Sequence, residues 1–135
     1  MGLFAIFLLL QLVLAGLPNT MVAQIRNGVR WIGQPINWFE ANSPEFSMIH
    51  LVMFILISSI SHFAFPRASF PRLLFFLMMF AVLTEMLQLF VPGRAPGATD
   101  FIADLLGILI GLGIVFVGSV IVRRNNPSVD DPFEF

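Results

Sequence analysis

The sequence predicts an all-α integral membrane protein, a bundle in which four helices cross the bilayer. Of its 135 residues, 58% are hydrophobic and only 11% are charged, whereas a soluble domain carries about 25% charged residues. Too few polar side chains are present to build a water-exposed surface. The 16 phenylalanines and the absence of tyrosine suit a lipid-facing surface. The third observation is a series of apolar runs, each near the length of a membrane-crossing helix.

These runs predict the order of the spans. A membrane-crossing helix needs about 20 mostly apolar residues, with a range of about 17 to 25. We expect spans over about residues 2–20, 46–65, 70–91 and 101–122. The first reaches full length only with residues beyond Pro18. We expect it to stay as an uncleaved helix, because it lacks the basic start of a signal peptide.

Proline, glycine and capping residues mark the ends of the spans. Pro66 and Pro71 bracket a tight turn between the second and third runs, and Pro92 follows the third. Thr99 or Asp100 is expected to cap the fourth helix, because their side-chain oxygens can accept hydrogen bonds from its first N–H groups.

Outside the spans, two segments are polar. Residues 1–124 are expected to form a single membrane domain, followed by a disordered polar tail over residues 125–135. Between the first two spans, residues 21–44 carry apolar positions at helical spacing together with Trp31 and Trp38. We expect an amphipathic helix lying on the membrane surface, and the alternative is an ordered loop packed over the helix ends.

Arginines near the helix ends predict the orientation. The side that holds the chain termini receives Arg67, Arg72, Arg123 and Arg124. The other side receives Arg26, Arg30 and Arg94. Because Lys and Arg accumulate on the cytoplasmic side, we expect both termini in the cytoplasm.

Polar side chains from three predicted spans fall at one depth. At a rise of about 1.5 Å per residue, Glu85 lies about 9 Å inside the end of the third span and His50 about 6 Å inside the start of the second. Asp104 lies one turn inside Asp100, and Gln88 shares a helix face with Glu85. Ionisable residues in membrane spans usually face a bundle interior or a wet cavity and indicate function. We therefore expect an extracytoplasmic pocket lined by His50, Glu85, Gln88, Arg94, Asp100 and Asp104.

Two glycines continue the acidic face of the fourth span. Asp100, Asp104, Gly107 and Gly111 fall on one helical stripe. Gly107 and Gly111 allow a neighbouring helix to approach closely. We expect this neighbour to be the helix that bears Glu85.

Four of these polar residues also have a purely structural interpretation. Glu85 would be half of a pair with Arg94 or His50, and His50 would be a hydrogen-bonded packing group. Arg94 would cap helix ends or neutralise Asp100. Gln88 would be a hydrogen-bonding scaffold.

The order of these residues resembles a known family. His50 is followed by TEMLQLFVPGR at residues 84–94 and then by the stripe of Asp100, Asp104, Gly107 and Gly111. A His, a T-E-x-x-Q-x-F-x-P-G-R run and a D-x-x-x-D/N-x-x-G-x-x-x-G stripe, here over about residues 46–115, resemble the VanZ-like membrane proteins. Family members usually carry Asn at the position of Asp104, so this chain has an additional carboxylate.

The resemblance implies a small multi-helix protein of the bacterial cytoplasmic membrane with a role in the cell envelope. The name-giving member is associated with low-level resistance to teicoplanin, a glycopeptide with a lipid tail. The resemblance does not identify a catalysed reaction or an oligomeric state.

Three functions fit these observations. In the first, the pocket binds an amphiphile such as a lipid-linked wall precursor or a lipoglycopeptide, and Arg94 contacts its phosphate or carboxylate. In the second, the chain is an intramembrane hydrolase or transferase with His50 as acid or base and Glu85 or Asp104 as its partner. In the third, it is a structural or assembly subunit whose polar cluster locks the helices together.

Composition excludes several classes of cofactor and partner. Without cysteine there is no disulfide and no thiolate metal site. A net charge of −1 and the lack of lysine argue against nucleic acid as a partner. No metal-ligand spacing motif is present, so we expect no cofactor and no metal. A metal held by His50 and carboxylates is a variant of the enzyme hypothesis, and membrane lipids are the expected partners.

Overall fold

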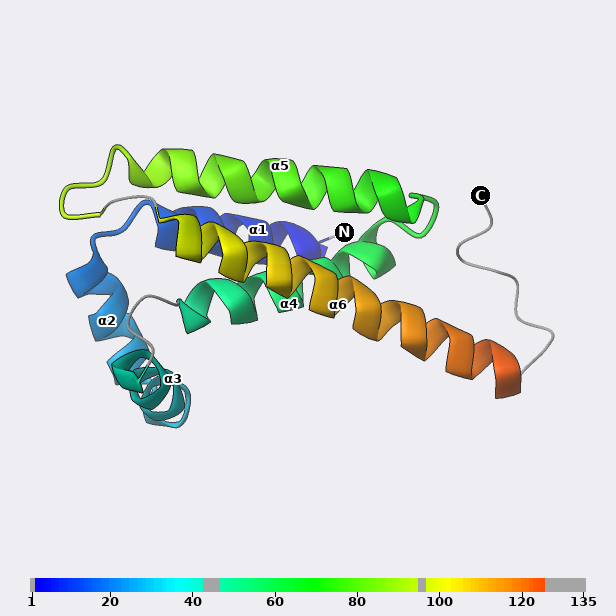
Figure 1. The fold of residues 1–135 in the computed structure, drawn as a ribbon, viewed down its shortest axis with the longest axis horizontal. Coiled ribbons are helices and arrows are strands. Elements are labelled where there is room, and N and C mark those ends of the chain that lie inside the picture. The colour runs from blue at the N-terminus through cyan, green and yellow to red at the C-terminus, as the bar shows by residue number, and fades with distance from the viewer. Residues whose placement is uncertain (1, 43–46, 95–96, 126–135) are drawn as a thin grey trace.

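The computed structural model of the chain describes residues 2–42, 47–94 and 97–125, and this part of the chain is helical with no strand (Figure 1). Its helices are α1 (Gly2–Ala15), α2 (Asn19–Gly28), α3 (Arg30–Asn42), α4 (Met48–Ala64), α5 (Phe70–Gln88) and α6 (Ala98–Asn125). Helices α1, α4, α5 and α6 pack side by side, and α2 and α3 extend from one end of this bundle. The predicted all-α fold is confirmed. The predicted disordered tail lies outside the described residues, except for Asn125.

Two of the described helices are long and apolar enough to cross a membrane, α5 over Phe70–Gln88 and α6 over Ala98–Val122. The apolar helices α1 and α4 are shorter, with 14 and 17 residues. Helix α1 ends at Ala15, not near residue 20 as expected. Pro18, with φ −57° and ψ 148°, holds the chain extended before α2 begins, because its ring fixes φ and it has no N–H for a continuing helix.

The segment after α1 contains two helices where the sequence predicted one helix or an ordered loop. Helices α2 and α3 meet at Val29, whose φ of −113° and ψ of 83° are not helical. Their backbones touch at Gly33, where an added Cβ would lie only 2.6 Å from the carbonyl oxygen of Arg26. Trp31 and Trp38 point outward, with 79% and 69% of their surface exposed.

One end of the bundle gathers the helix termini that carry the predicted pocket. Helices α1 and α5 end there, and α4 and α6 begin there, beside α2 and α3 (Figure 1). The His50 end of α4, the Glu85 end of α5 and the Asp104 end of α6 therefore share one end of the fold.

The closest helix pair is α4 with α6. A Cβ added at Gly107 would lie 2.7 Å from the carbonyl oxygen of Leu51 and 2.8 Å from Cβ of Phe54. Ser58 Oγ of α4 also donates a hydrogen bond to the carbonyl of Gly107, at 3.3 Å. The expectation that the glycine stripe packs on the helix bearing Glu85 is wrong, because it packs on α4, the helix bearing His50.

Large side chains explain why α5 does not take this place. Helix α5 contributes Leu73, Leu77 and Phe80 to the hydrophobic core, where they meet Phe54 and Ile108. Bulky residues at a helix contact keep the axes apart, whereas small ones let backbones approach. The α4 face opposite the glycines instead presents mainly serine side chains and backbone atoms, together with Cβ of Phe54.

The α4–α6 contact leads to a stability prediction. Gly111→Ala would place a methyl group 2.5 Å from the carbonyl oxygen of Ile55 and closer still to Ser58 Oγ. Overpacking of this kind costs about 1–3 kcal/mol, so we expect a lower midpoint of thermal unfolding for the detergent-purified protein. Gly113→Ala is the matched control, since an added Cβ there meets nothing within 4 Å. Equal midpoints for the two variants would contradict the prediction.

Candidate functional site

Four buried polar side chains meet where α4, α5 and α6 come together. They are His50 from α4, Glu85 and Gln88 from α5 and Asp104 from α6, with exposures of 3%, 8%, 1% and 0%. We call these four residues the polar cluster. Buried polar groups cost free energy unless they form hydrogen bonds. The contacts inside the cluster therefore decide how much its burial destabilises the fold.

The shortest contact joins His50 and Asp104. His50 Nδ1 lies 2.8 Å from Asp104 Oδ1. An ionised carboxylate only accepts hydrogen bonds, so Nδ1 donates. The second carboxylate oxygen, Asp104 Oδ2, is buried without a hydrogen-bond partner among the described residues. Asp104 thus orients the imidazole and keeps one oxygen available.

Gln88 holds the other side of the imidazole ring. Its Nε2 lies 3.3 Å from His50 Nε2. With the proton on Nδ1, the ring Nε2 is an acceptor, and the amide N–H of Gln88 donates to it. Both ring nitrogens therefore have partners, and the ring plane is fixed from two helices.

Glu85 links the cluster to the start of α6. Its Oε1 lies 3.8 Å from His50 Nδ1, and its Oε2 accepts a hydrogen bond from the N–H of Gly97 at 3.2 Å. Gly97 directly precedes α6, so the carboxylate sits at the positive end of that helix dipole. The end of α5 and the beginning of α6 are tied together by this one side chain.

Asp100 lies beside the cluster in the first turn of α6. The helix begins at Ala98, so the expectation that Thr99 or Asp100 caps it is wrong, although an acid in the first turn still complements the helix dipole. Asp100 is partly exposed. His50, Glu85 and Asp100 each offer a ligand-type atom, and these three atoms lie within 4.8 Å of one another.

Arg94 makes its described hydrogen bonds to the end of α1 and to the first residue of α2. Its Nη1 donates to the carbonyls of Leu14 and Ala15 at 2.8 and 3.0 Å, and its Nε donates to Asn19 Oδ1 at 2.7 Å. The last carbonyls of a helix have no partner within the helix, and the guanidinium supplies one. Burial lowers the pKa of Arg94, while the Asp100 and Glu85 carboxylates oppose that shift. Its predicted contact with an anionic ligand stays a prediction.

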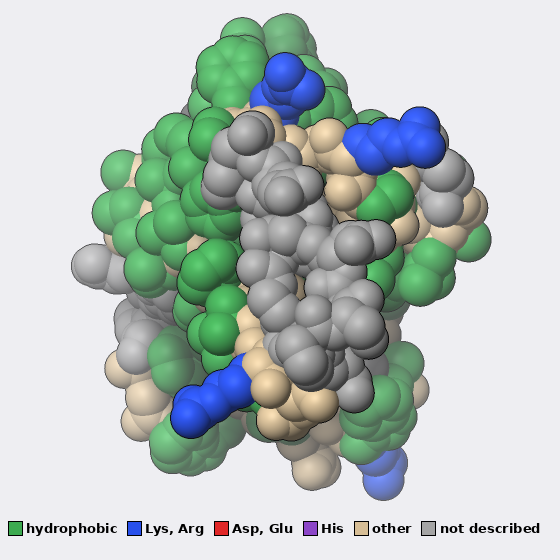
Figure 2. All heavy atoms as spheres, turned by 90° about the vertical axis from the view of Figure 1, so that its right-hand side faces the viewer, with side chains coloured by type: hydrophobic (Ala, Val, Ile, Leu, Met, Phe, Trp, Pro, Cys, Tyr) green, Lys and Arg blue, Asp and Glu red, His purple; other side chains and the backbone are tan. Residues whose placement is uncertain are grey.

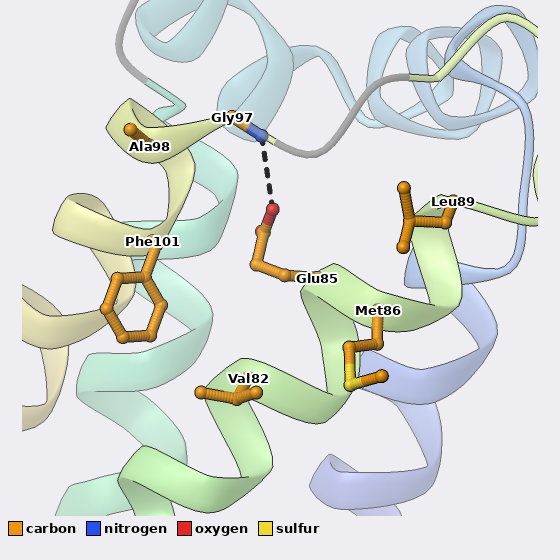
Figure 3. Close-up of a pocket in the computed structure, with 7 residues that line it drawn as sticks. All are labelled: Val82, Glu85, Met86, Leu89, Gly97, Ala98 and Phe101. Atoms are coloured by element: carbon orange, nitrogen blue, oxygen red, sulfur yellow. Dashed lines mark hydrogen bonds between the residues drawn. The ribbon is translucent and has the colours of Figure 1, made fainter.

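An apolar groove opens next to Glu85, between α5 and α6 (Figure 3). Its volume is about 330 Å³. Its walls are Val82 and Met86 of α5, Leu89 directly after this helix, and Gly97, Ala98 and Phe101 around the start of α6. Glu85 supplies the carboxylate of this lining and points towards Gly97.

Sequence reasoning missed this groove, although part of its signal was present. Val82, Glu85, Met86 and Leu89 are spaced at i, i+3, i+4 and i+7, which places them on one helix face. In a membrane span, apolar residues around an acid look like ordinary lipid-facing positions. Tertiary packing decides which helix lies opposite this face, and the sequence did not show that it is α6 with Phe101.

The Arg94 contacts predict a local loss of stability. Arg94→Gln removes charge-assisted hydrogen bonds, each contributing about 1.5–3 kcal/mol, and leaves the Leu14 and Ala15 carbonyls without them. We expect a lower midpoint of thermal unfolding and faster amide hydrogen exchange at the end of α1. Arg67→Gln, in the exposed α4–α5 turn, is the control and should leave both unchanged. Exchange at α1 identical in the two variants would show that Arg94 does not hold this helix end.

Comparisons with known proteins agree with the resemblance predicted from the site residues. The family model described as VanZ/LLP1 matches residues 3–121, which includes α1, the polar cluster, Arg94 and the glycine stripe. No curated protein and no solved structure matches the chain. Because the family model covers most of its length, the chain belongs to the VanZ/LLP1 family.

Proposed function

We propose that this chain is a multi-pass protein of the bacterial cytoplasmic membrane that binds an amphiphile, with the ligand's polar head at the polar cluster and its apolar chain in the α5–α6 groove. The observation that carries the proposal is the groove itself, whose lining is apolar except for the Glu85 carboxylate. Family membership is consistent with a role in the cell envelope or in glycopeptide resistance.

The groove favours a particular ligand chemistry. Ligand sites of small molecules have volumes of about 300–1,000 Å³, and this groove, at about 330 Å³, suits part of one lipid chain and the beginning of its head. An ionised Glu85 only accepts hydrogen bonds, so the head would present hydroxyl, amine or amide N–H groups. A lipid-linked wall precursor and a lipoglycopeptide such as teicoplanin both have this character.

Exposed apolar side chains support a four-span arrangement. Large hydrophobic residues with more than half of their surface exposed occur on α1, α4, α5 and α6, among them Leu9, Phe63, Phe75 and Ile114. Exposed apolar surface on this scale needs a lipid or protein partner. Helices α1 and α4 are short for a span, and a locally thinned bilayer accommodates short spans at modest cost. The exposed Trp31 and Trp38 suit α3 to the membrane interface.

Charge at the far end of the bundle supports the orientation. Figure 2 looks onto the end opposite the polar cluster, where arginine side chains stand among apolar ones and no acidic side chain of the described residues is in view. Arg67, Arg72 and Arg124 are exposed. By the positive-inside rule this end would be cytoplasmic, and the groove would open near the extracytoplasmic side.

A second function is favoured by one contact. The 2.8 Å bond between Asp104 and His50 is the arrangement in which a carboxylate orients an imidazole for acid–base catalysis. An intramembrane hydrolase or transferase acting on the same lipid head is therefore the alternative. The third candidate is a structural or assembly subunit, in which the polar cluster only holds the helices together.

Groove occupancy can be tested with a matched pair of variants. Met86→Trp fills the groove, whereas Met79→Trp changes the same residue type on the same helix at similar exposure, 53% against 55%, outside the groove lining. The probes are teicoplanin, a polyprenyl-linked wall precursor and phosphatidylethanolamine, each added to detergent-purified protein and followed by native mass spectrometry and thermal unfolding. We expect at least one probe to stabilise the wild type and Met79→Trp but not Met86→Trp. No stabilisation by any probe, or equal stabilisation of both variants, would contradict the proposal.

Two further variants separate the three candidates. Glu85→Gln keeps the side-chain shape and removes a charged acceptor whose hydrogen bond contributes about 1.5–3 kcal/mol, so ligand affinity should fall about tenfold or more. If the wild type converts a bound probe and His50→Ala still binds this probe but no longer converts it, the chain is an enzyme. Reduced thermal stability of Glu85→Gln without any ligand effect in the wild type would indicate the structural role.

A further inference from the structure

The geometry points to a divalent metal site formed by His50, Glu85 and Asp100, with the Asp104 carboxylate next to the nitrogen of His50 that would bind the ion. The inference does not depend on amphiphile binding, because it rests on the arrangement of these side chains alone. The ion that suits one imidazole and several carboxylate oxygens is Zn²⁺ or Mn²⁺.

The first support is the spacing of the ligand atoms. Two atoms bound to one tetrahedral ion at about 2.1 Å lie about 3.4 Å apart. His50 Nδ1 and Glu85 Oε1 are 3.8 Å apart, and one atom from each of His50, Glu85 and Asp100 falls within 4.8 Å of the others.

The second, independent support is the free oxygen of Asp104. This residue is fully buried, and its Oδ2 has no partner among the described residues. Its other oxygen already contacts His50 Nδ1, so the carboxylate is directed at the proposed ligand set. A buried oxygen without a partner is costly, and an ion next to it would remove that cost either directly or through a bound water.

The third support is the balance of charge. Glu85, Asp100 and Asp104 bring three carboxylates to one imidazole, and Arg94 supplies one nearby positive charge that acts on Glu85 and Asp100. Ionised acids in a largely apolar surrounding are costly unless they are neutralised. A divalent ion bound to a neutral imidazole would balance the remaining two negative charges.

The amide of Gln88 permits both states of the ring. Without metal, its N–H donates to His50 Nε2, which lies 3.3 Å away. With metal on Nδ1, the ring proton moves to Nε2, and the amide turned over offers its oxygen as the acceptor. Ligating histidines are commonly held through their other nitrogen in this way. Because Glu85 also lines the groove, the ion would lie beside it.

The test is metal binding by the full-length protein, purified in detergent through a tag without histidine and kept free of added lipid. After dialysis against ZnCl₂ or MnCl₂ and then metal-free buffer, we expect about one ion per chain by mass spectrometric elemental analysis. A ligand about 100-fold above its dissociation constant raises the unfolding midpoint by several degrees, and EDTA should reverse the rise. MgCl₂ should give a smaller shift, because imidazole is a poor ligand for Mg²⁺.

Variants assign the ligands. His50→Gln and Asp100→Asn should each lose most of the bound ion, whereas His62→Gln, which changes the other histidine of α4, and Glu40→Gln in α3 should keep it. If His50→Gln does not fold, Asp100→Asn decides, because Asp100 is partly exposed and the substitution keeps its shape. No bound ion in the wild type, or equal binding by Asp100→Asn, would overturn the proposal. Because the assay measures bound ion and no lipid probe is added, either result leaves the amphiphile proposal to its own test.

Discussion

The close approach of α6 to α4 is the constraint on which the polar cluster depends. Gly107 and Gly111 bring the α6 backbone against α4 so tightly that a single added carbon would collide with it. Only this spacing places Asp104, one turn before Gly107, within 2.8 Å of His50. At the ordinary distance between helices that carry larger side chains, both groups would be buried without each other, which costs several kcal/mol.

Helix α5 joins the bundle in a different way, and the difference creates the groove. Along most of its length, large side chains such as Leu77 and Phe80 meet the core. At its end the contact becomes polar, through Gln88 to His50 and through Glu85 to Gly97. Small residues at the start of α6, Gly97 and Ala98, cannot fill the space next to Met86, so an apolar opening remains beside a carboxylate.

Helix α1 belongs to the same unit, although it contributes no residue to the polar cluster. Arg94 donates to its last carbonyls, and Phe4 reaches the core at the other end. Arg94 lies in the turn after α5, so these hydrogen bonds join the end of α1 to the end of α5. The family match from residue 3 to residue 121 covers all of these contacts.

The sequence by itself determined the features that depend on local chemistry. Apolar runs and prolines predicted α4, α5, α6 and the start of α1. Helical spacing put His50, Glu85, Gln88 and Asp104 at one depth, where the structure brings them into contact. Tertiary packing decided that the glycine stripe faces α4, that Arg94 binds residues about 80 positions earlier and that an apolar groove opens at Glu85. The reason is physical: helical periodicity assigns a residue to a face, but which faces meet depends on the sizes of side chains on all helices at once.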